Sequence, residues 1–379
     1  MNFKLDEEQQ LLRDETQKLS REVFKDRAAR WDQNSEVPWD NIKLLAEKGY
    51  FGLIVPEEHG GSEGSIFGLI LALEQIAWSC VSTALFVFSS NVHANRILQL
   101  GTDAQKKRYL PGIATGKLLP SHAMSEPQAG SDANRMRTTA VRTGNEYVIN
   151  GNKCWISRAT VADLVIVDAK IKDGDHQENG MLIVDRGTPG LEIGRVENML
   201  GHRGSPSTEL NFKDCKVPLE NRMSEGSFAA AMTAMSLSRC GNAAMALGAA
   251  QRAYDEAVEY VQQREAFGKH LSDFQGLRWM IADMNVKLEA ARLLIYRAAA
   301  NASDGFPSAM EAAIAKTFAN EAALAVASDA MQLFGANGLS TSYPLERIYR
   351  DIRGFAIAGG TTQIQRNLIA RGILGKRKY

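Results

Sequence analysis

The feature that most constrains the fold is a change of sequence pattern that occurs twice along the chain. Between Lys117 and about Arg222, short apolar or alternating runs are separated by turn pairs such as Asn150-Gly151 and Pro189-Gly190. This pattern is typical of a small antiparallel β domain. On both sides of the segment the pattern is helical. The expected order of the chain is therefore helical, β, helical.

The helical parts are long and have few breaks. After Pro218 no proline occurs until Pro307, and the intervening sequence is rich in Ala, Leu, Met, Glu and Arg, interrupted only at Phe267-Gly268. The helices expected elsewhere are 7–27, 39–48, a buried pair over 66–98, 104–110, 309–333 and 363–373. We therefore expect an N-terminal helical domain (1–116), a central β domain (117–224) and a C-terminal helical bundle (225–379).

Composition limits the classes of protein to which the chain can belong. With 379 residues and 45% hydrophobic residues, it can bury the cores of two or three domains. Forty-four basic and forty-four acidic residues cancel, and the only basic tail is Lys376-Arg377-Lys378, so no nucleic-acid partner is expected. No signal peptide or apolar run of membrane length is found, which favours a cytoplasmic protein without a membrane contact. The four cysteines have no CxxC spacing and are expected to be buried or bystander thiols.

Several common cofactor signatures are absent from the sequence. No GxGxxG motif follows an expected strand, which argues against a Rossmann dinucleotide site. The stretch 112–118 looks like a phosphate-binding loop, but it is one residue short and has Leu118 where Ser or Thr must reach magnesium. The six histidines have no metal-binding spacing, so no metal site is expected.

A glycine-rich turn near the C-terminus is a candidate binding site. Gly359-Gly360-Thr361-Thr362 leads into an amphipathic run, which places backbone N–H groups at the N-terminus of a helix, where a carbonyl or phosphate can be held. Two upstream stretches add suitable chemistry. Residues 123–132 offer hydroxyl groups and free N–H groups, and 153–157 put a flat aromatic side chain beside a hydroxyl on a strand. Further stretches of the same set are 263–268, 273–275 and 331–338.

The joint occurrence of these stretches, in this order, resembles the acyl-CoA dehydrogenase family of flavoproteins over essentially the whole chain. The resemblance implies a mainly α fold with a central β domain: a helical domain, a β-barrel or sandwich and a four-helix bundle. It also implies FAD between the domains, an acyl-CoA thioester substrate, a homotetramer, and an electron-transferring flavoprotein as the electron acceptor.

The resemblance assigns roles residue by residue. Met124, Ser125 and Ser131 would line the flavin, Trp155 would lie against its ring, and the Ser157 hydroxyl would lie near flavin N5. The pyrophosphate and adenine would be held, largely across a subunit interface, by Arg264, Phe274, Gln275, Gln332 and Gly335. Thr361 and Gln363 would close over the cofactor. The substrate would contact Ser131, Ser238, Arg239, Gly359 and Gly360, with Ser131 and Arg239 on its CoA part.

The chain departs from the family pattern at the catalytic base. Most members read Glu-Gly-Thr at this turn and use the Glu to remove the α proton of the thioester, but this chain has Gly359 there. A minority place the Glu on a helix of the bundle, and the matching position here is Ser238. The Gly359 N–H can still polarise the thioester, whereas ordinary α-proton abstraction has no glutamate.

Two branches of the family share a glutamate-free turn. One oxidises cyclohex-1-ene-1-carboxyl-CoA to cyclohexa-1,5-diene-1-carboxyl-CoA by 1,4-elimination in anaerobic aromatic and alicyclic degradation, with an aspartate that aligns with Asn91. The other is a desulfinase that releases sulfite from sulfinopropanoyl-CoA, with an arginine that aligns near Ala84. We favour the alicyclic branch, because Asn differs from Asp by one atom, and expect that Asn91→Asp raises turnover; His93 is the base candidate otherwise. A desulfinase-like lyase and a catalytically silent acyl-CoA and FAD-binding protein are the alternatives.

Overall fold

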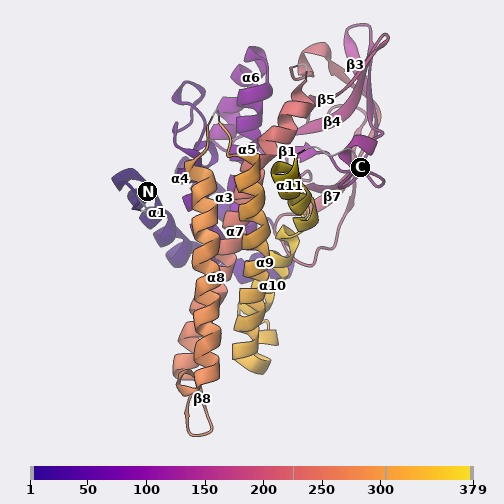
Figure 1. Cartoon of the computed structure of the whole chain (residues 1–379). Helices are drawn as coiled ribbons and strands as arrows, with labels where there is room; N and C mark the ends of the chain where they lie inside the picture. Colours follow the sequence, from indigo (N-terminus) through magenta and orange to yellow (C-terminus); the bar gives the residue numbers. More distant parts are fainter. Residues whose placement is uncertain (1–3, 225, 304, 376–379) are drawn as a thin grey trace.

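The computed structural model describes residues 4–224, 226–303 and 305–375, and it has the expected order of helical, β and helical parts (Figure 1). The predicted fold class is thereby confirmed. The basic residues Lys376-Arg377-Lys378 lie outside the described residues. Within the described residues, no helix is both long enough and apolar enough to cross a membrane.

The N-terminal part is helical up to Ala114. The run expected as one helix over 7–27 is interrupted by a π-helical turn, where the Ser20 hydroxyl donates a hydrogen bond to the carbonyl of Gln75 at 2.6 Å. The apolar run 66–98 forms the expected pair of buried helices, which meet at Cys80. The elements are α1 (Glu7–Leu19), η1 (Ser20–Phe24), α2 (Ala28–Asn34), α3 (Trp39–Glu47), η2 (Tyr50–Gly52), η3 (Glu57–His59), α4 (Ile66–Ser79), α5 (Val81–Leu100) and α6 (Asp103–Ala114).

The central part is one seven-stranded sheet with the order β1-β4-β2-β3-β7-β6, in which β5 pairs with β4. The strands are β1 (Pro120–Ala123), β2 (Thr139–Thr143), β3 (Glu146–Ser157), β4 (Leu164–Asp173), β5 (His176–Asp185), β6 (Leu191–Val196) and β7 (Ser207–Pro218), with short helices η4 (Ala133–Arg135) and η5 (Leu219–Asn221). The prediction of a purely antiparallel domain is wrong, because β1 and β2 both pair with β4 in parallel.

The pair Asn150-Gly151 is not a turn, contrary to the prediction. It lies within β3, where the pairing with β7 shifts register between Ile149 and Gly151. Gly151 has a positive φ of 152°, and a Cβ at this position would lie 2.4 Å from the Thr138 hydroxyl oxygen. The glycine therefore serves a β-bulge packed against the next segment and not a hairpin.

The C-terminal part is a helical bundle around α7 (Ser227–Gln263), which packs on α4, α8 and α9. A Cβ at Gly248 of α7 would lie 2.0 Å from the Glu74 carbonyl oxygen, so glycine allows α4 and α7 to touch. The break expected at Phe267-Gly268 is a small hairpin, and α10 was not predicted. The other elements are β8 (Glu265–Ala266), β9 (Lys269–His270), η6 (Leu271–Asp273), α8 (Gln275–Ala300), α9 (Ala309–Phe334), η7 (Gly335–Leu339), α10 (Leu345–Phe355) and α11 (Thr362–Leu374).

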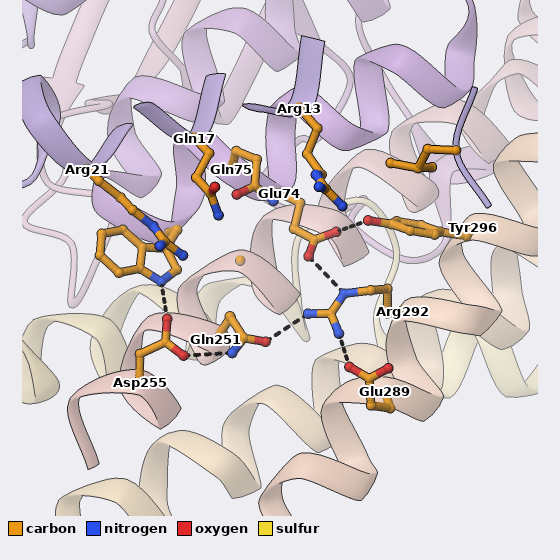
Figure 2. Close-up of a pocket in the computed structure, with 13 residues that line it drawn as sticks. Arg13, Gln17, Arg21, Glu74, Gln75, Gln251, Asp255, Glu289, Arg292 and Tyr296 are labelled. Carbon is orange, nitrogen blue, oxygen red and sulfur yellow. Dashed lines mark hydrogen bonds and ion pairs between the residues drawn. The ribbon is translucent and has the colours of Figure 1, made fainter. Parts of the chain in front are cut away.

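A polar network joins the first helical part to the bundle (Figure 2). The buried carboxylate of Glu74 accepts hydrogen bonds from Arg292 Nε at 3.0 Å and from the Tyr296 hydroxyl at 2.8 Å. Asp255 accepts one from the Trp78 indole at 2.7 Å. These groups line a cavity of about 490 Å³, to which none of the predicted site residues contributes. Because its buried charges are paired with one another, we interpret this network as structural.

Candidate active site

The turn after α10 has the geometry that the sequence indicated. Gly359 and Gly360 have φ values of 68° and 88°, a region that glycine occupies without the cost of a side chain. The Thr361 hydroxyl then accepts a hydrogen bond from the Ile364 N–H at 3.2 Å and caps α11. The turn therefore holds backbone groups at the N-terminus of a helix, where a partial positive charge lies.

Two buried side chains of α9 donate hydrogen bonds to the turn and to the end of α10. Lys316 Nζ donates to the carbonyl oxygens of Phe355 at 3.1 Å and Gly360 at 2.7 Å. Asn320 Nδ2 donates to the Phe355 carbonyl at 2.7 Å and to Asn242 Oδ1 at 3.0 Å. Burial and, to a lesser extent, the charge of Arg239 lower the pKa of Lys316 to about 7. The turn is thus fixed by an ammonium group that titrates near neutral pH.

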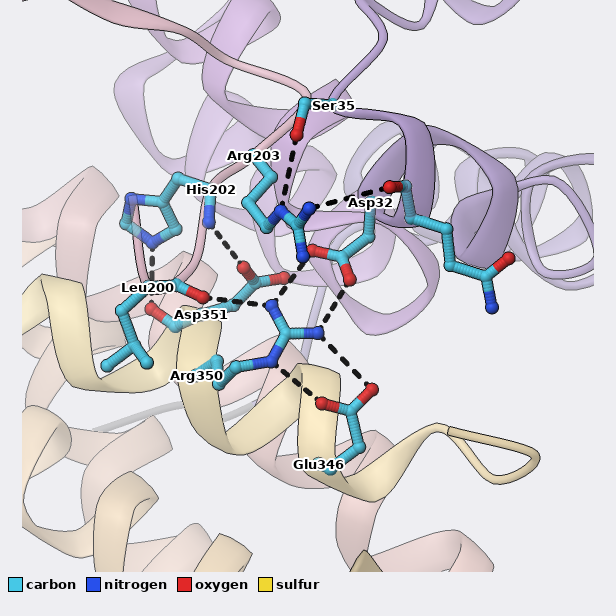
Figure 3. Close-up of polar contacts among 9 residues, drawn as sticks. Asp32, Ser35, Leu200, His202, Arg203, Glu346, Arg350 and Asp351 are labelled. Carbon is cyan, nitrogen blue, oxygen red and sulfur yellow. Dashed lines mark hydrogen bonds and ion pairs between the residues drawn. The ribbon is translucent and has the colours of Figure 1, made fainter. Parts of the chain in front are cut away.

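The start of the turn is anchored where α10 meets α2 and the loop between β6 and β7 (Figure 3). Arg350 makes a bidentate ion pair with Asp32, at 2.6 and 3.0 Å, and donates to the Leu200 carbonyl at 2.9 Å. Next to it, the His202 N–H donates to Asp351 Oδ1 at 2.5 Å. Burial raises the pKa of Asp351, and His202 opposes this. All three parts of the chain therefore converge on the helix that leads into the turn.

A second group of predicted residues gathers at the end of β1 and on β3. The buried Lys153 donates to the Met124 carbonyl at 3.0 Å and to Glu126 at 2.9 Å, and the Cys154 N–H donates to the Ser125 carbonyl at 3.0 Å. Burial alone would raise the pKa of Glu126. Hydrogen bonds from the Thr138 and Arg137 amides and from Lys153 instead lower it to about 2. This ion pair fixes the loop that carries Met124 and Ser125 beside the strand of Trp155.

Trp155 has an unusual backbone conformation. Its φ is 61°, rare for a bulky residue, and it lies in a register shift of the β3–β7 pairing between Lys153 and Ile156. Its side chain is 57% exposed, which leaves an indole face free to stack on a flat ligand. Ser157 lies two residues further on, and its carbonyl accepts a hydrogen bond from the Ser121 hydroxyl at 2.8 Å. A backbone conformation as rare as that of Trp155 is found preferentially at functional sites. Ser131, in the loop between β1 and η4, is also exposed.

The residues expected at the pyrophosphate and adenine form a separate group. Arg264, Gln332 and Gly335 line a cavity of about 380 Å³ at the ends of α7 and α9. Phe274 and Gln275 lie where α8 begins, and Lys269 Nζ lies 4.2 Å from the centre of the Phe274 ring. This group is near the β8 hairpin, far from the sheet (Figure 1). Twenty-five residues of helical rise, about 38 Å, separate Arg264 from Arg239 on α7.

The remaining predicted residues have different environments. Arg239 is buried, Ser238 is half-buried, and Gln363 is exposed. Asn91 is fully buried in α5: its amide donates to the carbonyls of Tyr50 at 2.8 Å and Val87 at 3.0 Å, and its oxygen accepts from the Ile54 N–H at 3.3 Å. These contacts favour a structural role for Asn91, and its assignment as the base position stays a prediction.

Three residues of the site were missed in the sequence: Lys316, Asn320 and Asn242. A signal for Lys316 was present, because it lies on a helical face made of alanines, including Ala312, Ala315 and Ala319, where a lysine is out of place. Asn320 lies one turn further along the same face. Within the described residues no cluster of His, Cys, Asp or Glu suits a metal ion.

Family models match three consecutive parts of the chain. The N-terminal, middle and C-terminal domains of acyl-CoA dehydrogenase match residues 6–117, 121–215 and 226–374. The chain belongs to the acyl-CoA dehydrogenase family. The predicted assignment as an oxidoreductase acting on the CH–CH group of an acyl-CoA is thereby confirmed at the level of the family. The domain boundaries that the sequence indicated stay predictions, which these matches resemble closely.

Curated relatives in this family act on different acyl groups. The chain is 39% identical to a 3-sulfinopropanoyl-CoA desulfinase from Paraburkholderia xenovorans, over 99% of this chain and 98% of the relative. It is 37% identical to a cyclohexane-1-carbonyl-CoA dehydrogenase from Geobacter metallireducens, over 98% of this chain and 99% of the relative. A desulfinase and a dehydrogenase of a six-membered ring thioester are thus found among relatives of similar identity.

Solved structures share the whole fold. Butyryl-CoA dehydrogenase from Megasphaera elsdenii is 34% identical, with a TM-score of 0.94 over 99% of this chain and 100% of its own. A chain in a structure of the electron-transferring flavoprotein of Acidaminococcus fermentans is 35% identical, with a TM-score of 0.95 and the same coverage. PigA, solved with FAD and proline, is 27% identical, with a TM-score of 0.93 over 98% of this chain and 99% of its own.

Proposed function

We propose that the chain is an FAD-dependent dehydrogenase of an alicyclic acyl-CoA, converting cyclohex-1-ene-1-carboxyl-CoA to cyclohexa-1,5-diene-1-carboxyl-CoA. The observation that carries the proposal is the turn at Gly359, where φ is 68° and no side chain is available to take the α proton. A 1,4-elimination removes a proton further along the conjugated system, so it does not need a base at this point. The relative from Geobacter metallireducens, which acts on a six-membered ring thioester, supports the class of substrate.

The residues present fit FAD. Trp155 offers an exposed indole face, and the loop of Met124 and Ser125 is fixed beside it by Lys153. The cavity lined by Arg264, Gln332 and Gly335 offers a cation and backbone groups for the pyrophosphate and adenine end. FAD, when bound, supplies the acceptor for the hydride that leaves the acyl group.

The chain itself orients and polarises the thioester. In the proposed complex, the Gly359 N–H donates to the thioester carbonyl oxygen and thereby makes the protons of the conjugated acyl group more acidic. The hydrogen bonds from Lys316 and Asn320 to the Phe355 carbonyl keep this N–H in place during the reaction. Ser131 is proposed to contact the CoA part, whereas Arg239, which the resemblance also assigned to CoA, is buried. Position and electrostatics thus supply most of the catalysis.

The base of the reaction is the open step of the proposal. The resemblance implies that Asn91 stands where the alicyclic branch has its aspartate, as a natural departure or an engineered substitution. An Asn amide neither ionises nor accepts a proton near neutral pH. A comparison of Asn91→Asp with His93→Ala separates the two candidate positions: a gain in turnover in the first favours position 91, and loss of turnover in the second alone favours His93.

The decisive experiment is an anaerobic titration of the FAD-loaded protein with cyclohex-1-ene-1-carboxyl-CoA. The absorbance of the oxidised flavin and the mass of the product are followed together. Bleaching with formation of the diene thioester is the expected result. Binding without bleaching or product would leave the catalytically silent acyl-CoA and FAD-binding protein as the explanation.

A desulfinase-like lyase is the second candidate, and a specific observation favours it. The buried cations Lys316 and Arg239 lie close to the turn and have no carboxylate partner among the described residues. An acyl group that carries a sulfinate would supply the missing anion. Against it, Ala84, where the branch's arginine is expected, is fully buried.

In the reaction of a desulfinase the C–S bond breaks, a proton takes its place on carbon, and sulfite is released with the oxygen of one water. Sulfite release without flavin reduction would establish this second candidate.

The partners follow from the same proposal. The acyl-CoA thioester is the substrate, and an electron-transferring flavoprotein is the proposed acceptor of the electrons. A homotetramer is proposed because the group of Arg264, Gln332 and Gly335 lies near the β8 hairpin, far from the sheet that carries Trp155 (Figure 1), so that a neighbouring subunit would complete each site. A cytoplasmic location agrees with such partners.

A further inference from the structure

Lys316, which contacts the turn, and Arg239, whose charge acts on Lys316, are buried cations that make no ion pair within the described residues. Lys316 is fully buried and Arg239 is 7% exposed. In the parts of the chain that the structure describes, neither makes an ion pair with a carboxylate. The acidic residues of α9 are engaged elsewhere: Glu311 pairs with Arg297 at 3.4 Å, and Glu321 pairs with Arg366 at 2.6 Å. Burying a cation without an anionic partner costs free energy, which points to a ligand that supplies the negative charge.

The groups around Gly359 have hydrogen-bond donors to spare and few acceptors. Lys316 donates to two carbonyls, which leaves a third N–H when the amine is protonated. Arg239 Nε has no hydrogen-bond partner. The Asn242 oxygen accepts from Asn320 at 3.0 Å, so the group that Asn242 can still offer is its NH₂. Such a set of donors suits an anion.

Lys316 and Asn242 border the space that a side chain at position 359 would enter. A Cβ built on Gly359 lies 3.9 Å from both Lys316 Cε and Asn242 Nδ2. Arg239 and Asn242 are three residues apart on α7 and therefore share a face of the helix. Gly359 is exposed at the surface of the single chain, whereas the cations are not. The glycine thus leaves room for a ligand group at the point where the donors converge.

We propose that Lys316, Arg239 and Asn242 bind an anionic group, a carboxylate or sulfinate, carried by the acyl part of the substrate. The inference rests on the proposed function, because it requires an acyl-CoA thioester at the turn. It names a further substrate class for the same site, a thioester whose acyl part carries a second acid group; cyclohex-1-ene-1-carboxyl-CoA lacks such a group, and the substrate of the desulfinase-like candidate has one. An anion attached to the substrate reaches the buried cations together with the thioester, and its binding offsets the cost of burying them.

The test compares two thioesters of equal chain length, butanoyl-CoA and succinyl-CoA, which differ in a terminal methyl or carboxylate group. Their Kd values are measured by calorimetry on the FAD-loaded protein. We expect succinyl-CoA to bind at least about ten-fold more tightly than butanoyl-CoA, which is the usual gain in affinity from hydrogen bonds to a charged group. Arg239→Gln and Lys316→Met should each bring the ratio toward one. Because Arg239 makes no hydrogen bond that the described residues show, its variant keeps the proposal testable if Lys316→Met does not fold.

Lys287→Met is the matched control, since it removes a half-exposed lysine of α8 that is paired with Asp329 at 3.2 Å. It should keep the ratio of the wild-type protein. Equal Kd values for the two thioesters in the wild-type protein, or a ratio that survives both variants, would overturn the inference and leave the proposed function intact. If neither thioester binds but cyclohex-1-ene-1-carboxyl-CoA does, the inference is wrong and the proposed function stands; if none of the three binds, both fail. If added acetate tightens butanoyl-CoA binding as much as the attached carboxylate does, the anion is a free one and the assignment to the substrate is wrong.

Discussion

At the scale of single residues, Lys316 gives the site a dependence on pH. Burial, with a further contribution from Arg239, lowers the pKa of Lys316 to about 7. The ammonium form, which binds an anion, is thus present below about pH 7 and is lost above it. We expect the Kd of succinyl-CoA to rise above pH 7, by up to about ten-fold per pH unit, and that of butanoyl-CoA to change little. Calorimetry at pH values from about 6 to about 9, on both sides of this pKa, checks this. A parallel change in the Kd of both thioesters would contradict it.

Asn91 gives a second prediction at this scale. Replacing its NH₂ group by a carboxylate oxygen removes the donors to the Tyr50 and Val87 carbonyls and sets an acceptor against them. We expect Asn91→Asp to lower the free energy of unfolding by about 3 kcal/mol, measured by urea denaturation. Asn95 lies in the same helix and donates one hydrogen bond to the Gly305 carbonyl, so Asn95→Asp should lower the free energy of unfolding by less. An unchanged stability together with a strong gain in turnover would instead support position 91 as the base.

At the scale of elements, the placement of α10 decides where the turn lies. Arg350 joins α10 to Asp32 of α2 and to the Leu200 carbonyl, and the ion pair is largely buried. We expect Arg350→Met to destabilise the protein by about 3 kcal/mol, because it leaves a buried carboxylate without its partner. Arg366→Met is the control: its bidentate pair with Glu321 is exposed, so its loss should cost at most about 1 kcal/mol. Equal losses in urea denaturation would show that burial is not the cause.

The elements also show what the sequence could and could not predict. The buried helices α4 and α5 followed from a long apolar run, and α7 from the absence of proline. The missed helix α10 had a readable signal, since Leu345, Ile348, Ile352 and Phe355 are spaced for one buried face. The parallel pairing of β1 and β2 with β4 had no such signal, because strand order depends on contacts between residues distant in sequence. The same holds for the site. The glycine turn could be predicted from its own residues, but Lys316, which donates to it, belongs to another helix and its contact could not be predicted.

At the scale of the whole molecule, the group of Arg264, Gln332 and Gly335 lies near the β8 hairpin, far from the sheet that carries Trp155 (Figure 1), which predicts that FAD is retained only in the assembled oligomer. The exposed apolar residues Trp279, Val286 and Leu293 of α8 recur every seven residues and so lie near one face of this helix. We expect Val286→Asp to weaken association and to lower the FAD content of the protein together, because each site would lose the groups of its neighbour. Light scattering coupled to size-exclusion chromatography, with flavin absorbance read on the same peak, measures both. Leu11→Asp, which changes an equally exposed leucine of α1, should change neither. A monomeric Val286→Asp protein that keeps its full FAD content would show that one chain binds the cofactor alone.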